Sequence, residues 1–137
     1  MSEENLADTF NKMNAPFAKT MGVRMTLVTK SRVEGELDVT EENCTIPPTL
    51  HGGAIMAFAD NMGGIGAFMN MPEGAITTTI ESKTNFLRAI PVGQVAKGVS
   101  TPVNIGRTLQ VWKTEVFRED GKLAAVVTQT QIIRPGD

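Results

Sequence analysis

The sequence has almost none of the residues that build disulfides, metal centres or two-histidine sites. Its 137 residues include one cysteine, Cys44, and one histidine, His51. A single cysteine excludes a disulfide within the chain and any zinc site that needs several cysteines. A single histidine excludes any catalytic mechanism that needs two histidines in one chain. We therefore expect no metal site in this chain.

Long apolar runs and an excess of positive charge are also missing. No apolar run approaches the roughly 18 residues that a membrane-spanning helix needs. Lysine and arginine total 13, against 15 aspartate and glutamate residues, whereas nucleic-acid binders normally carry a basic excess. The first residues, MSEENLADTF, are acidic, where a signal peptide is basic. We expect a cytoplasmic protein with no membrane or nucleic-acid partner.

The composition and the first hydrophobic pattern predict one domain over residues 1–137 with a short helix at its start. Hydrophobic residues make up 41% and charged residues 20%, which is ordinary for a folded soluble domain. We expect one short amphipathic helix within residues 1–20, with Pro16 at its end. Its apolar residues, at helical spacing, are Leu6, Phe10, Met13 and Phe17.

Strand patterns surround one long helical segment. Alternating apolar residues predict strands over 21–28 and 33–39, followed by a loop over 41–50. The segment HGGAIMAFADNMGGIGAFMN, residues 51–70, has the one long helical pattern in the sequence. This order indicates an α+β domain with a largely antiparallel sheet. Its remaining strands are expected over 76–87, 93–105, 108–117 and 123–133.

The predicted long helix has one bulky face and one nearly bare face. At about 100° per residue, five large side chains form one stripe that we expect to pack on the sheet: Ile55, Phe58, Met62, Ile65 and Met69. Small residues surround Asp60 on the other side: Gly53, Ala57, Gly63, Gly64 and Ala67. Glycine inside a helix costs roughly 0.5–1 kcal/mol relative to alanine. Either these glycines allow close packing into a curved sheet, or another helix or a ligand lies against the Asp60 face.

Two parts of this helix suggest chemistry. Asp60 is an acid in mid-helix among alanine, methionine and glycine, so it is either a solvated carboxylate or a base or nucleophile in a partly apolar pocket. His51, Gly52 and Gly53 lie at the helix start, where free backbone N–H groups can bind the oxyanion that forms on a carbonyl. The other interpretation of this segment is a tight turn at two glycines, with His51 as a cap.

The two parts lie too far apart to act together within one helix. Gly52 and Asp60 are eight residues apart, or ~12 Å along the helix axis, so they cannot both reach one carbonyl group. Two antiparallel copies of the helix, related by a two-fold axis, would place the start of one copy beside the Asp60 of the other. The sequence therefore predicts a two-fold dimer with two composite sites.

The segments HGGAIMAFAD, TTTIESKTNFLRAI and NFLRAIPVGQ resemble those of acyl-CoA thioesterases with the hotdog fold, in the PaaI-like branch of the 4-hydroxybenzoyl-CoA thioesterase superfamily. The resemblance covers roughly residues 20–134. It implies an antiparallel sheet wrapped around the central helix, and a homodimer with a continuous sheet, often paired into a homotetramer. It also implies an acyl-CoA substrate and no separate cofactor, because coenzyme A is part of the substrate.

The resemblance implies roles for individual positions. Gly52, after the motif histidine His51, would supply an oxyanion N–H. The helical acid, Asp60 of the partner subunit, would act as general base or as nucleophile, and the sequence does not choose between these roles. A hydroxyl on the next strand would help to position water; Thr79 matches it, with Thr78 as the alternative.

Substrate contacts are expected at further positions. The family often has an asparagine or glutamine six residues before the motif histidine; Thr45 stands there, and Asn43 is close but in a different register. Arg88 and Arg107 would meet the coenzyme A phosphates, unless they are simply solvated surface residues. The other expected substrate-binding residues are Gly53, Asn61 and Thr108.

The sequence thus predicts hydrolysis of acyl-CoA thioesters, with two alternatives. A hydratase or dehydratase of the same fold would pair a histidine with an acid, a role for which His51 is poorly placed. A non-catalytic acyl-CoA sensor would tend to lack the acid. Cys44 has no evident base and is expected to be inert. The acyl group cannot be predicted, but we expect apolar residues to line its pocket: Met56, Phe58, Met62 and Phe86.

Overall fold

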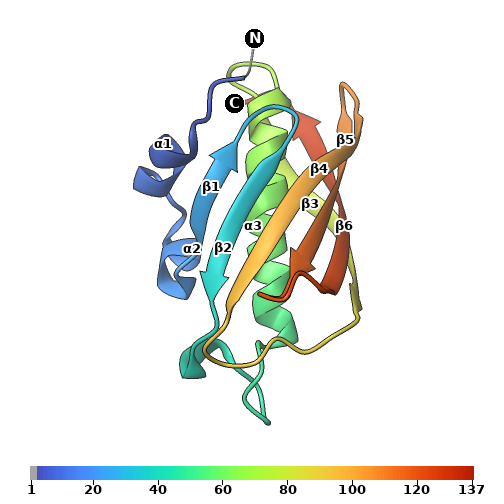
Figure 1. Cartoon of the computed structure of the whole chain (residues 1–137). Coiled ribbons are helices and arrows are strands. Elements are labelled where there is room, and N and C mark those ends of the chain that lie inside the picture. The colour runs from blue at the N-terminus through green and yellow to red at the C-terminus, as the bar shows by residue number, and fades with distance from the viewer. Residues whose placement is uncertain (1–2) are drawn as a thin grey trace.

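The helices and strands of the computed structural model, which describes residues 3–137, follow the sequence pattern (Figure 1). The helical elements are α1 (Ala7–Lys12), α2 (Pro16–Met21), the short 3-10 helix η1 (Glu41–Asn43) and α3 (Gly52–Asn70). The strands are β1 (Arg24–Val28), β2 (Val33–Asp38), β3 (Ile76–Phe86), β4 (Val95–Ile105), β5 (Leu109–Phe117) and β6 (Leu123–Arg134). None of the helices within residues 3–137 is long and apolar enough to cross a membrane.

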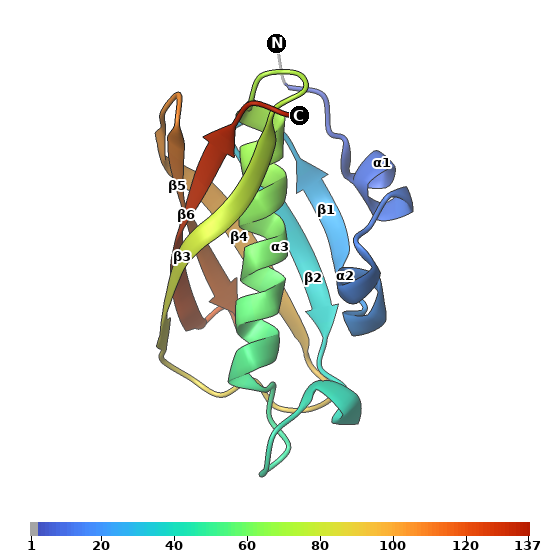
Figure 2. The ribbon, with the colours of Figure 1, turned by 180° about the vertical axis from the view of Figure 1, so that it is seen from behind.

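The six strands form one antiparallel sheet that wraps around α3. Their order is β1-β2-β4-β5-β6-β3, and every neighbouring pair is antiparallel. Seen from behind, α3 lies across the inner face of this sheet (Figure 2). The predicted α+β class, the antiparallel sheet and the central helix are therefore confirmed.

The sheet covers more of α3 than the helix pattern predicts. Phe58 and Met62 of the bulky stripe are fully buried, as expected. Gly63 and Ala67, however, are buried as well, although the pattern assigns them to the bare face. A Cβ atom on Gly63 would lie 2.3 Å from the side chain of Gln129 in β6. Of the two explanations offered for the glycines, close packing into a curved sheet therefore applies to Gly63, because the sheet packs on two sides of the helix.

The start of the chain forms two helices in place of the one expected within residues 1–20. Pro16 occupies the first turn of α2, where proline is favoured because its missing N–H needs no acceptor there. It therefore begins a helix, whereas we expected it to end one. Both helices lie beside β1 (Figure 1), and the Asn11 side chain ties α1 to β1 through hydrogen bonds to the backbone N and O of Met25, at 2.7 and 2.9 Å.

Strand β3 lies at one edge of the sheet and pairs there with β6 alone. It has 11 residues, and none of them is fully buried. Its large apolar side chains are exposed, with 41% of Ile76, 56% of Ile80 and 54% of Phe86 accessible. A long, unpaired and partly apolar edge is a surface on which another strand can pair.

Candidate active site

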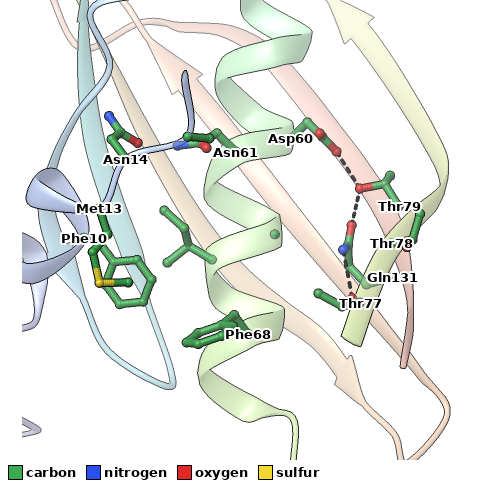
Figure 3. A pocket seen from close by; sticks show the side chains of 13 residues that line it. Phe10, Met13, Asn14, Asp60, Asn61, Phe68, Thr77, Thr78, Thr79 and Gln131 are labelled. Atoms are coloured by element: carbon green, nitrogen blue, oxygen red, sulfur yellow. Dashed lines mark hydrogen bonds between the residues drawn. The ribbon is translucent and has the colours of Figure 1, made fainter. Parts of the chain in front are cut away.

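Asp60 lies on the exposed side of α3 and is held by two other elements, of which Figure 3 shows Thr79 of β3. Its Oδ1 accepts a hydrogen bond from Thr79 Oγ1 of β3 at 2.7 Å and one from Gln129 Nε2 of β6 at 3.2 Å. Its Oδ2 accepts no hydrogen bond from residues 3–137. The carboxylate is therefore fixed through one oxygen and free at the other. Among the residues that the structure describes, Thr78, the alternative hydroxyl, makes no hydrogen bond to Asp60.

A buried polar cluster supports Asp60 from within the sheet. Gln129 and Gln131 expose 0% and 2% of their surface. Gln129 Nε2 donates to Gln131 Oε1 at 2.9 Å, and Gln131 Nε2 donates to Thr77 Oγ1 at 3.1 Å. Sequence reasoning missed both glutamines. The signal was the alternation along β6, which places them on the same inward face as the apolar Val127.

A pocket of about 420 Å³ opens beside Asp60. Thr77, Thr79 and Gln131 form its polar side, with Asp60 between them and the apolar side (Figure 3). The apolar side comes from α3, from α1 and from the connection between α1 and α2: Phe10, Met13, Ala15, Ile65 and Phe68. A carboxylate next to an apolar cavity can act on the polar end of a mostly apolar molecule.

Most of the residues expected to line the acyl pocket do not line the pocket beside Asp60. Phe58 and Met62 are fully buried in the core and do not line the pocket beside Asp60. Phe86 lies at the start of α3, where its ring would be 3.1 Å from a Cβ atom on Gly52. Asn61, expected to bind substrate, does line this pocket, and its Nδ2 is buried without a hydrogen-bond partner in the described chain.

The start of α3 leaves one backbone N–H available. His51 caps the helix, because its Nδ1 accepts a hydrogen bond from the Gly53 N–H at 2.8 Å. The N–H groups of Ala54 and Ile55 donate to the His51 carbonyl oxygen. The Gly52 N–H has no acceptor within residues 3–137. The geometry thus fits His51 as a cap and Gly52 as a free donor at the positive end of the helix dipole.

Asn43 lies at the start of α3, where it lines a pocket of about 340 Å³ with His51 and Gly53. The Asn43 side chain joins a capping box with Thr40 and donates to the Asp38 carbonyl oxygen at 2.9 Å. Thr45 is exposed on the loop before α3. Partial burial, together with the Glu41 carboxylate, raises the pKa of the Cys44 thiol, which favours the less reactive protonated form.

The two expected arginines lie at opposite ends of α3. Arg88 lines a pocket of about 360 Å³ with Gly52 and Phe86, and its Nη1 donates to the Leu123 carbonyl oxygen at 2.7 Å. Arg107 and Thr108 instead line a pocket near the end of α3, with residues 72–75 and 133–136. Only Arg88 of this pair is therefore close to the free Gly52 N–H. No group of three or more metal-ligating side chains occurs in the described residues.

Comparisons with known proteins agree with this fold. The model of the thioesterase superfamily matches residues 48–125. The proofreading thioesterase EntH of Cronobacter sakazakii is 28% identical over 118 residues, which cover 83% of this chain and 85% of that protein. A crystal structure of a thioesterase from Haemophilus influenzae has 24% identity and a TM-score of 0.85, covering 98% of this chain and 92% of the other. The E. coli PaaI protein has 18% identity and a TM-score of 0.84, covering 95% and 91%.

The fold is the hotdog fold, in which an antiparallel sheet wraps around one central helix. The chain belongs to the thioesterase superfamily. The resemblance to PaaI-like thioesterases seen in the sequence is confirmed at the level of family and fold, and thioester hydrolysis is the general activity that this family supports.

Proposed function

We propose that this protein hydrolyses acyl-CoA thioesters to a free acid and coenzyme A, with Asp60 as the reacting carboxylate. The observation that carries the proposal is the state of that carboxylate beside a pocket with an apolar side. Thr79 and Gln129 hold Oδ1, whereas Oδ2 accepts no hydrogen bond from the residues that the structure describes. Such a group can activate water or attack a carbonyl carbon at a fixed position.

The oxyanion site in this proposal is the start of α3. The Gly52 N–H would donate to the thioester carbonyl oxygen as negative charge develops there, assisted by the helix dipole. Within one chain, Gly52 and Asp60 are separated by ~12 Å along the helix. The proposed site therefore joins Gly52 of one copy to Asp60 of the partner subunit, and the active unit is a two-fold homodimer.

The exposed edge of the sheet supports this assembly. Antiparallel pairing of β3 with the partner's copy of the strand would continue the sheet and cover its exposed Ile80. A two-fold axis there also makes the two copies of α3 antiparallel, as the composite site requires. Two such dimers could pair further into a tetramer without changing the site.

Two chemical routes fit the geometry. As a general base, Asp60 takes a proton from water while the resulting hydroxide attacks the carbonyl carbon; the C–S bond then breaks, and the coenzyme A thiolate takes up the proton. As a nucleophile, Asp60 forms a mixed anhydride, expels the thiolate, and is released when water hydrolyses the anhydride. Both routes use Oδ2 and the same oxyanion donor.

The proposal also assigns binding residues to the acyl group and to the coenzyme A phosphates. The apolar side of the pocket, formed by Phe10, Met13, Ile65 and Phe68, would take the acyl group. Arg88, which lies close to Gly52, would meet the coenzyme A phosphates. The expected cytoplasmic location remains part of this proposal, since acyl-CoA esters are intracellular metabolites.

Replacing Asp60 tests the proposed activity. Asp60→Asn keeps the size of the side chain but removes the base, so we expect kcat for acyl-CoA hydrolysis to fall by about 10²–10⁴-fold. Thiol release from a panel of acyl-CoA esters measures this. Asp8→Asn, which changes an exposed acid in α1, should leave the rate unchanged.

Three results would contradict the proposal. Native rates in Asp60→Asn would remove the assigned role of Asp60. Addition of water to an enoyl thioester without release of thiol would indicate a hydratase. Binding of acyl-CoA without any hydrolysis by the native protein would indicate a sensor.

A further inference from the structure

We infer that Gln129, oriented by Gln131, is a positioning residue that anchors Asp60 through Oδ1 and thereby directs Oδ2 at the substrate. This inference rests on the proposed function and names a part of the site that lies outside the sequence motif. It follows from four observations: the burial of both glutamines, the orientation of the Gln129 amide, the single hydrogen of Thr79, and the glycine at position 63.

Both glutamines are buried on the inner face of β6, where a side chain without hydrogen bonds would be costly. Gln129 is fully buried and Gln131 exposes 2%. Burying an amide without hydrogen-bond partners loses the bonds that water made to it and gains none in return. Gln129 Nε2 offsets this cost by donating hydrogen bonds to Gln131 Oε1 and to Asp60 Oδ1. Gln129 and Gln131 thus connect the Asp60 carboxylate by hydrogen bonds to the buried face of β6.

The surroundings of Gln129 fix the orientation of its amide. Nε2 lies among three oxygens: Asp60 Oδ1 at 3.2 Å, the Asp60 carbonyl oxygen at 3.5 Å, and Gln131 Oε1 at 2.9 Å. Gln129 Oε1 is buried and has no partner among the described residues. A flipped amide would place an oxygen against these three oxygens. The NH₂ group therefore faces the carboxylate.

Thr79 alone cannot hold Asp60 in place. Its hydroxyl oxygen is within hydrogen-bond distance of Asp60 Oδ1 and of Gln131 Oε1. Both are acceptors, and a hydroxyl has one hydrogen to donate. Whenever Thr79 donates to Gln131, the bond from Gln129 is the one that keeps Oδ1 fixed. A reaction at Oδ2 leaves both bonds to Oδ1 available throughout.

Gly63 gives Gln129 the space to reach Asp60. It lies one helical turn after Asp60, and a Cβ atom on it would be 2.3 Å from both Cδ and Oε1 of Gln129. Real Cβ atoms do not approach other atoms so closely. Because Gly63 has no side chain, the Gln129 side chain can pack against α3 and reach Asp60.

The test compares two buried glutamines. Gln129→Met keeps most of the volume and removes the donor, so kcat should fall by about 10–100-fold, the effect of one hydrogen bond to a charged group, with KM little changed. Gln110→Met is the matched control. Gln110 is also fully buried and bonds to α3, through the Ala67 carbonyl oxygen at 3.3 Å, but does not contact Asp60. It should lose stability and keep its kcat.

A second variant keeps the test valid if Gln129→Met does not fold. Gln129→Glu is nearly isosteric and faces Asp60, the titratable side chain that position 129 contacts. Its ionised form repels the Asp60 carboxylate, whereas its protonated form can donate to it. We expect its kcat, relative to the native enzyme, to rise as the buffer is made more acidic. A purely structural role would give a constant ratio.

The outcomes separate this inference from the proposed function. If Asp60→Asn is inactive while Gln129→Met has native kcat, the positioning role is wrong and the thioesterase proposal stands. Equal losses of kcat in Gln129→Met and Gln110→Met would also overturn it, since the effect would then belong to the core. If Asp60→Asn is fully active, both proposals fall together.

Discussion

At the scale of single residues, Arg88 offers a test of the proposed coenzyme A binding that is separate from the thioester chemistry. Its guanidinium is fixed by the Leu123 carbonyl oxygen and lies in the pocket that contains Gly52. Arg88→Gln removes a charge that would contact phosphate, so we expect KM for acyl-CoA to rise by about tenfold, with kcat little changed. Steady-state kinetics with an acyl-CoA ester measures this.

The matched substrate is the same acyl group on pantetheine, which lacks the nucleotide phosphates. Its KM should not respond to Arg88→Gln. If KM for the pantetheine ester rises equally, Arg88 does not act through phosphate. If Arg107→Gln and not Arg88→Gln raises KM for the coenzyme A ester, the nucleotide binds at the other end of α3.

At the scale of elements, the close packing of α3 on β5 predicts that alanine in place of Gly66 destabilises the fold, although helix propensity alone favours alanine. A Cβ atom on Gly66 would lie 2.6–2.8 Å from the distal ring atoms of Trp112. Gly66→Ala should therefore destabilise the fold by about 1–3 kcal/mol, although alanine is the better helix former by roughly 1 kcal/mol. Urea denaturation measures the free energy of unfolding.

A double-mutant cycle identifies the cause of that loss. In a Trp112→Leu background the ring is gone, so Gly66→Ala should cost less or should stabilise the protein. If Gly66→Ala costs the same in both backgrounds, the steric explanation is wrong.

The sequence predicted the elements well where a regular pattern reflects local structure. The strands and α3 were predicted to within a few residues, because alternation and the helical period depend on the chain itself. The two N-terminal helices were not separated, since Pro16 can end a helix or begin one. The helical projection left open whether Gly63 packs on the sheet or faces a partner, because it does not include the curvature of the sheet.

The candidate site was predictable in the helix and only partly in the strands. Asp60 and Gly52 stand in a recognisable segment, and Thr79 was one of two neighbouring hydroxyls. Gln129 is far from Asp60 in the sequence and meets it because α3 packs on β6. Gln131 is connected to Asp60 through Gln129 and Thr79. A contact of that kind depends on sheet order, which the pattern of one strand does not contain.

At the scale of the whole molecule, the proposed site forms only between two chains. Substitution of Gly52 by proline tests the part that its backbone N–H plays. Gly52 is the first residue of α3, and His51 before it has φ −62° and ψ 137°, a conformation that residues before proline adopt. Gly52→Pro therefore removes the proposed oxyanion donor at a position that tolerates proline. We expect kcat to fall by about 10²–10³-fold. Gly52→Ala, which keeps the N–H and adds the same Cβ contact with Phe86, is the control.

Co-expression of two inactive variants, Asp60→Asn and Gly52→Pro, with different affinity tags tests whether each site is shared between two subunits. In a dimer with composite sites, each mixed pair has one site with both defects and one intact site. Random pairing should then restore about one quarter of native thioesterase activity, and purification through both tags about one half. A mixed dimer that is no more active than its two parents would show that Gly52 and Asp60 do not meet across the two subunits.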